Sequence, residues 1–186
     1  MTDATSSDSI DAIAEAWKRE LPGVPVQSIG IVTRVWHIAK LLGDDRARLL
    51  RSRHADMATL DLLSTLRRHG RPYRMTTREL AAASLITAGA ITQRVDRAEA
   101  QGLVKRSGRR DSRTVDIELT PLGHATVDDL VAAVLTRECQ LLDGLSKDQQ
   151  DHLEHTLRLL LQHLSGLLGV EQRASHVGHP ATGQDA

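Results

Sequence analysis

The stretch at residues 76–120 constrains the fold more than any other part of the chain. Its first part, residues 77–84, has the apolar spacing of a short helix. Thr87 can cap a second helix, because its hydroxyl can accept a hydrogen bond from a free backbone N–H of the first turn. Gly102 is well placed to end that helix in a left-handed conformation. The second helix places three apolar residues on one stripe, namely Ile91, Val95 and Ala98.

Two short runs of strand type follow, at residues 103–106 and 115–119. The loop between them, residues 107–113, is polar and basic. Two helices joined by a tight turn and followed by a hairpin with a basic tip are typical of a winged helix-turn-helix. The second helix of such a module can enter a DNA major groove, and the hairpin tip can reach a neighbouring backbone or the minor groove.

The residue composition favours a mainly helical protein. Only 2% of residues are aromatic and phenylalanine is absent, so the core must be built from Leu, Ile, Val and Ala. The single Cys139 excludes a disulfide framework within the chain and favours a reducing compartment. The sequence shows neither a signal peptide nor an apolar run of membrane-spanning length. We therefore expect a soluble cytoplasmic protein without a membrane partner.

The net charge of zero conceals an uneven distribution. Residues 62–120 contain 12 Lys and Arg against 6 Asp and Glu, out of totals of 24 and 24. The rest of the chain therefore has 12 basic and 18 acidic residues. An ordinary solvated surface could also carry such an excess, but here the excess coincides with the predicted helix-turn-helix. A basic head on an acidic body suits binding to phosphates.

The predicted fold is a winged helix-turn-helix domain combined with a helical dimerisation layer. We expect a helix over residues 27–42 to be broken at residues 43–45, and another to run from Pro121 to about Leu142. Leucine-rich faces at both ends of the chain need a partner, either in a dimer or in an intramolecular bundle. The predicted segments are 1–8, a disordered N-terminus; 9–55, N-terminal dimerisation helices; 56–120, the DNA-binding domain; 121–169, C-terminal dimerisation helices; and 170–186, a disordered tail.

The predicted DNA contacts fall into two groups. The first should supply affinity through phosphates and comprises Lys105, Arg109, Arg110 and Arg113. The second should supply specificity through the second helix and comprises Thr87, Ala88, Gly89, Thr92, Gln93 and Arg97. A pseudo-palindromic operator would match a two-fold symmetric dimer with two such heads.

Several motifs together make the chain resemble the MarR family of bacterial transcription regulators. They are Thr77-Arg78-Glu79-Leu80-Ala81, Gly89-Ala90-Ile91-Thr92-Gln93-Arg94-Val95-Asp96-Arg97, Gly102-Leu103-Val104, Asp111-Ser112-Arg113 and Leu119-Thr120-Pro121-Leu122-Gly123. The resemblance covers most of residues 10–168 and implies a homodimeric repressor of transcription. It also implies that Arg113 enters the minor groove and that Asp111 steadies the wing.

A narrower resemblance concerns a ligand pocket. Trp17, Asp61, Arg94 and Arg106 resemble a set found in the urate-responsive branch of that family, some members of which answer to citrate or trans-aconitate. The resemblance implies a pocket between the dimerisation layer and the winged domain, where two guanidinium groups hold an anion and the Trp ring offers a flat face. Alternatively, Trp17 is a core residue and Arg94 contacts phosphate. A buried Asp61 would need a partner, and an arginine is the natural one.

Other kinds of function find little support. The sequence has no glycine-rich phosphate loop, nucleophile elbow or HExxH motif, so we expect neither an enzyme nor a bound cofactor. His152 and His155 are too few for a zinc site, which usually needs three or four ligands. Cys139 fits a buried small residue of a dimer helix better than a peroxide sensor. The alternatives to a ligand-responsive repressor are a MarR-type regulator without an effector and a non-specific architectural DNA-binding protein.

Overall fold

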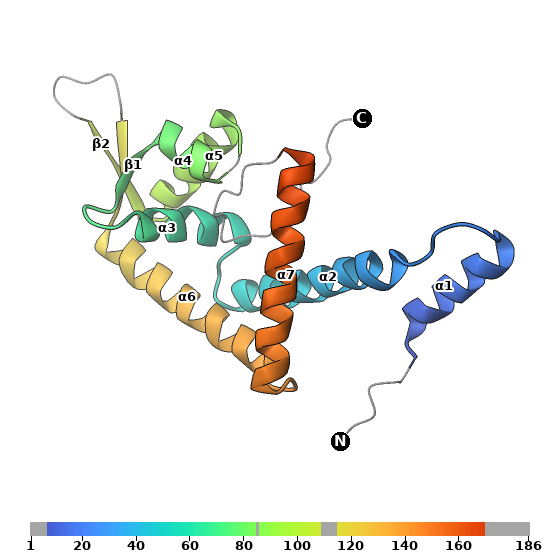
Figure 1. Cartoon of the computed structure of the whole chain (residues 1–186). Coiled ribbons are helices and arrows are strands. Elements are labelled where there is room, and N and C mark those ends of the chain that lie inside the picture. Colours follow the sequence, from blue (N-terminus) through green and yellow to red (C-terminus); the bar gives the residue numbers. More distant parts are fainter. Residues whose placement is uncertain (1–6, 85, 109–114, 170–186) are drawn as a thin grey trace. The chain divides into compact units, whose positions relative to one another are not determined.

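The structure is a computed structural model that describes residues 7–84, 86–108 and 115–169 (Figure 1). The chain divides into two compact units, residues 1–48 and 49–186. The first unit holds α1 (Ser9–Glu20) and most of α2 (Ile29–Ser52). The division falls within α2, between Arg48 and Leu49.

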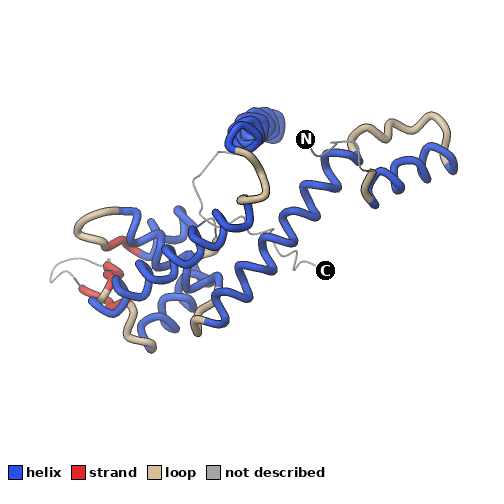
Figure 2. Tube along the Cα trace, turned by 90° about the horizontal axis from the view of Figure 1, so that it is seen from below, coloured by secondary structure: helices blue, strands red, loops and turns tan. Residues whose placement is uncertain are grey.

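The second unit is mainly helical and contains a small sheet (Figure 2). The three strands form an antiparallel sheet in the order β1-β3-β2. Its elements are, in chain order, α3 (Met57–His69), β1 (Arg74–Thr76), α4 (Thr77–Ser84), α5 (Ala88–Ala100), β2 (Val104–Gly108), β3 (Val115–Leu119), α6 (Pro121–Leu142) and α7 (Lys147–Leu168). Helices α4 and α5 with the β2–β3 hairpin form the predicted winged helix-turn-helix, and the predicted mainly α fold class is confirmed.

An aliphatic core holds the winged domain together. It gathers buried side chains from α3, α4, α5, the sheet and α6. Its fully buried members include Leu62, Leu63, Leu66, Leu80, Ile91, Val95, Ile117 and Val127. Tyr73 is partly buried and packs against this cluster. The buried side chains of the cluster are almost all aliphatic, as expected for a chain with so few aromatic residues.

The polar residues that flank the helices act as the sequence indicates. Thr87 accepts a hydrogen bond from the backbone N–H of Ala90 at the start of α5. Ser146 and Gln149 form a capping box at the start of α7. Gly102 and Gly169 follow α5 and α7 with φ of 71° and 62°, the left-handed region that favours glycine. Local signals of this kind explain why the predicted boundaries of α4, α5 and α6 lie within one or two residues of the observed ones.

The expected helix break at residues 43–45 is wrong, and one short strand was not predicted. Helix α2 continues through Gly43, where we expected a break. A glycine inside a helix costs only about 1 kcal/mol relative to alanine, and ion pairs of Lys40 with Asp44 and of Asp45 with Arg48 span the same turns. Strand β1 was not expected, because a three-residue strand has no periodicity of its own and forms only by pairing with β3.

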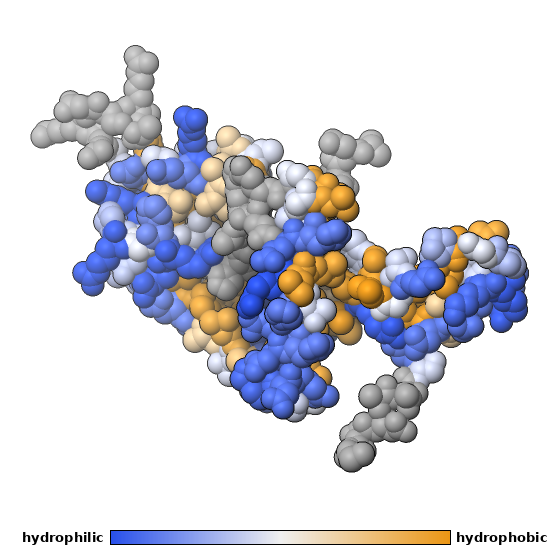
Figure 3. Space-filling model, in the orientation of Figure 1, coloured by the Kyte–Doolittle hydropathy of each residue, from blue (hydrophilic) through white to orange (hydrophobic). Residues whose placement is uncertain are grey.

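In the first unit, a cluster of ion pairs connects the start of α1 to α2. Arg34 on α2 donates to Asp8 and Asp11, at 2.9 and 2.8 Å for the closest Nη2 contacts. Asp8 also caps α1. Apolar side chains remain exposed along α2; they include Ile31, Trp36, Ile38 and Leu41. Figure 3 shows hydrophobic residues at the surface of the chain in orange.

None of the helices in the described residues has both the length and the apolar composition required to cross a membrane.

Candidate nucleic-acid interface

Helix α5 has one buried face and one exposed face. Ile91, Val95 and Ala98 point into the core of the winged domain. The exposed face carries every α5 residue of the predicted DNA-contacting set, together with the N-cap: Thr87, Ala88, Gly89, Thr92, Gln93 and Arg97. Because these residues recur at spacings of three and four, they form one continuous surface that a partner can reach.

Arg97 on this face pairs with the residue that caps α3. Its Nη1 lies 3.1 Å from Oδ2 of Asp56, whose carboxylate also accepts a hydrogen bond from the backbone N–H of Thr59 at 2.7 Å. Burial alone would raise the pKa of Asp56, but the bonds from Thr59 and the charge of Arg97 outweigh it and lower that pKa. Asp56 therefore links the start of α3 to α5, the second helix of the helix-turn-helix, which we call the recognition helix.

A second ion pair links the same two helices at greater depth. Nη1 of Arg94 donates to Oδ2 of Asp61 at 2.8 Å. Asp61 is buried on α3, and the side chain of Arg94 is 20% exposed. The structure thus provides the arginine partner that a buried Asp61 was expected to need.

Arg106 attaches the wing to the recognition helix. It lies on β2 and forms ion pairs with Asp96 and Glu99, both on α5. Its backbone N–H also donates to Oε1 of Glu99 at 3.1 Å. These carboxylates raise the pKa of Arg106, so the side chain stays charged. No sequence signal identified Asp96 and Glu99 as its partners, because the contacts depend on how β2 packs beside α5.

The remaining predicted phosphate contacts are only partly described. Lys105 is exposed on β2 and pairs with Glu118 of β3 at 3.5 Å. Four predicted wing residues lie outside the described residues: Arg109, Arg110, Asp111 and Arg113.

A tight junction joins the start of α6 to the end of α5. The Thr120 hydroxyl donates to the carbonyl oxygen of Gly102 at 2.7 Å and accepts from the N–H of Gly123 at 3.0 Å. The N–H of Thr120 donates to the carbonyl of Leu103 at 3.1 Å. A Cβ on Gly123 would lie 1.9 Å from that same oxygen, so only glycine fits. These contacts hold the start of α6 against Gly102 and Leu103, the residues that follow α5.

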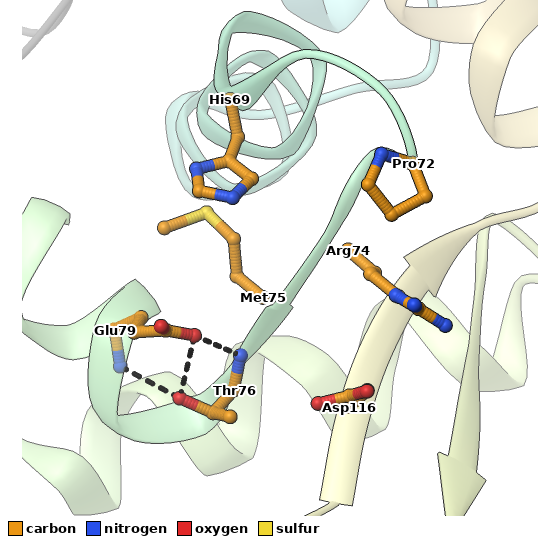
Figure 4. A pocket seen from close by; sticks show the side chains of 7 residues that line it. All are labelled: His69, Pro72, Arg74, Met75, Thr76, Glu79 and Asp116. Atoms are coloured by element: carbon orange, nitrogen blue, oxygen red, sulfur yellow. Dashed lines mark hydrogen bonds between the residues drawn. The ribbon is translucent and has the colours of Figure 1, made fainter.

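Two pockets of the winged domain are lined by residues other than the predicted ligand residues. One, of about 340 Å³, is lined by side chains from α3, β1, α4 and β3 (Figure 4). His69 and Arg74 face it together with Glu79, whose carboxylate accepts from the N–H and hydroxyl of Thr76. The other, of about 250 Å³, lies between α3 and α6 beside the Arg67–Asp128 pair. Neither contains a residue of the predicted ligand set.

Three residues of the predicted ligand set lie in the second unit, where Asp61 pairs with Arg94, and Arg106 pairs with Asp96 and Glu99. Trp17, on α1 in the first unit, is about half exposed. Cys139, which we expected to be buried, is exposed on α6 in the single chain. Within the described residues, no three His, Cys, Asp or Glu side chains are grouped so that they could hold a metal ion.

These features define a class of protein. A recognition helix with one exposed face, held from behind by α3 and flanked by a charged hairpin, is the DNA-binding unit of winged helix-turn-helix proteins.

The comparisons give the family. The MarR family pattern matches residues 56–114. The HTH-type transcriptional regulator PecS of Dickeya dadantii is 26% identical over 156 residues, which cover 83% of this chain and 94% of PecS. By the match over residues 56–114 and the likeness to PecS along most of its length, the chain is a MarR-type DNA-binding transcriptional regulator.

Solved structures share the fold. AbsC, a MarR family transcriptional regulator from Streptomyces coelicolor, matches with a TM-score of 0.61 and 22% identity, over 75% of this chain and 96% of AbsC. A mutant MarR from E. coli complexed with operator DNA matches with a TM-score of 0.59 and 22% identity, over 78% of this chain and 97% of that chain.

Proposed function

We propose that the protein is a homodimeric repressor that binds a pseudo-palindromic operator and is released from it by a small anionic metabolite. The observation that carries the DNA-binding part is the exposed face of α5, which gathers six predicted contact residues on one surface. This face would enter the major groove. Lys105 and the basic residues of the wing would contact phosphates beside it.

The dimer is supported by helix α7. No residue of this helix, all of which lies within the described part of the chain, is buried. Its exposed leucines follow one another at spacings of four and three residues and form a stripe: Leu153, Leu157, Leu161, Leu164 and Leu168. Burying each side chain would contribute on the order of 1 kcal/mol, and a second copy of this chain presents the same stripe.

The effector is supported by the position of Arg94. This residue joins the recognition helix to α3 through Asp61. A urate-, citrate- or trans-aconitate-like anion that captured Arg94 would compete with the Asp61 carboxylate and loosen that joint. Ligand and DNA would then oppose each other with a coupling of about 1–3 kcal/mol. A MarR-type regulator without an effector would show DNA binding and no such coupling.

The test uses the full chain and the DNA upstream of its own gene. We expect a specific footprint, weaker binding when salt is raised, and loss of the footprint with at least one of urate, citrate and trans-aconitate. Sedimentation at micromolar concentration should give a dimer. Binding without any footprint would instead favour an architectural DNA-binding protein, and a monomer throughout that range would overturn the dimer.

A further inference from the structure

On the face of α5 that would meet the base pairs, several polar side chains already have partners within the protein. Its charged side chains are engaged within the protein: Asp96 pairs with Arg106, and Arg97 pairs with Asp56. The hydroxyl of Thr92 is engaged as well, since it donates to the carbonyl oxygen of Ala88 at 2.9 Å. Arg97 keeps its remaining N–H groups, but these are donors only, so this face offers a base edge few side chains with both a free donor and a free acceptor.

Gln93 is the exception. Its side chain is exposed, and its amide makes no hydrogen bond to any of residues 7–84, 86–108 and 115–169. An amide offers two N–H donors and one carbonyl acceptor. One turn earlier lies Gly89, which has no side chain and where even an added Cβ would meet nothing within 4 Å. Ala88 beside it is equally small.

We propose that Gln93 is the base-reading residue of this protein and that it reads an A·T base pair in the major groove. Its carbonyl would accept from adenine N6 and its N–H would donate to adenine N7, the bidentate pattern that matches an amide to adenine alone among the bases. This inference rests on the proposed operator binding and specifies its chemistry.

Thr92 adds a second preference, which is also for an A·T base pair. Because its hydroxyl proton is donated back to the helix, Thr92 has no donor left, and it presents an acceptor oxygen and a methyl group to a partner. In the major groove the matching apolar group is the C5-methyl of thymine. Gln93 and Thr92 are adjacent on α5, so a half-site read by both would carry its A·T pair or pairs opposite this single turn of the helix.

The experiment selects binding sites for the full chain from a pool of DNA duplexes with a randomised centre. The wild-type protein should enrich a motif with a fixed A·T pair in each half-site. Gln93→Arg should change that pair to G·C, because arginine reads guanine O6 and N7, and should leave the other positions as they were. Gln93→Ala should lose the preference at that position alone, by roughly ten- to a hundredfold in relative affinity.

A matched control is Gln101→Arg. It makes the same chemical change at the exposed C-cap of α5, eight residues away, and should leave the selected motif unchanged. The inference is overturned if the wild-type motif persists in both Gln93 variants. A pool from which the wild-type chain enriches no motif would instead overturn the proposed operator binding itself, so the two failures are distinguishable.

Discussion

Asp61 on α3 and Arg94 on α5 form an ion pair of 2.8 Å behind the recognition helix. The carboxylate is buried and the guanidinium mostly so, which makes the cost of removing either partner larger than for a surface pair. We expect Asp61→Ala and Arg94→Ala each to lower the free energy of unfolding by about 2 kcal/mol, mostly through the uncompensated partner. Urea unfolding of both single variants and the double variant would measure the pair.

In this double-mutant cycle the double variant should be less destabilised than the sum of the single variants, by about 1 kcal/mol or more. Strict additivity would show that the two side chains do not act together. The pair between Arg67 and Asp128 is the natural comparison, because it joins α3 to α6 at the surface and should couple by no more than about 1 kcal/mol.

Gly123 gives a second stability prediction. A Cβ at this position would lie 1.9 Å from the Leu103 carbonyl oxygen and 3.3 Å from the Leu119 side chain, so Gly123→Ala must push α6 away from the wing. We expect a loss of about 3 kcal/mol or more in the free energy of unfolding. Thermal and urea unfolding would measure it.

The control for that substitution is Gly43→Ala, at a mid-helix glycine of α2 whose added Cβ would meet nothing within 4 Å. It should stabilise the chain by up to about 1 kcal/mol. Equal effects of the two substitutions would mean that the close approach of α6 to Leu103 does not constrain the fold.

The local signals of the sequence predicted most of the winged domain. Thr87 and Gly102 mark the ends of α5 through their own local conformation and hydrogen bonds, so their effect is visible in the sequence. The partners of Arg106 were not predictable in this way. Asp96 and Glu99 meet it only because β2 folds back beside α5, a contact between separate elements that no periodicity encodes.

Asp56 should make the free energy of unfolding depend on pH in the acidic range. Its pKa is lowered in the folded state, so its contribution is fully present above the pKa of an unfolded aspartate, about 3.9, and is lost as the pH falls through the lower folded value. Asp56→Asn keeps a good N-cap but removes the charge. We expect the variant to be less stable than wild type at neutral pH and the gap to close below about pH 4.

Urea unfolding at a series of pH values and one protein concentration would test this. A gap between Asp56→Asn and wild type that stays constant down to strongly acidic pH would contradict the assignment. The substitution should also strengthen DNA binding, because it frees Arg97 from a competing carboxylate and removes a negative charge near phosphate.

Arg97 itself should contribute to DNA affinity. Its guanidinium is on the exposed face of α5, and 62% of the side chain is accessible despite the pair with Asp56. If it contacts phosphate, Arg97→Ala should weaken binding about equally for all DNA sequences and lower the salt slope by about one. Binding measured by fluorescence anisotropy at several salt concentrations would show this, and an unchanged slope would remove Arg97 from the phosphate contacts.

Substitution of Arg106 can separate its structural role from its predicted role in ligand binding. As a structural link it holds β2 to α5 through Asp96 and Glu99, and exposed pairs of this kind contribute about 0.2–1 kcal/mol each. Arg106→Ala should therefore weaken DNA binding by less than about tenfold. As a ligand residue it should also be required for release, so the variant should stay on DNA when millimolar urate, citrate or trans-aconitate displaces the wild type. Arg67→Ala is the control, because it breaks the Asp128 pair and should retain release. Equal release of wild type and Arg106→Ala would leave Arg106 with its structural role alone.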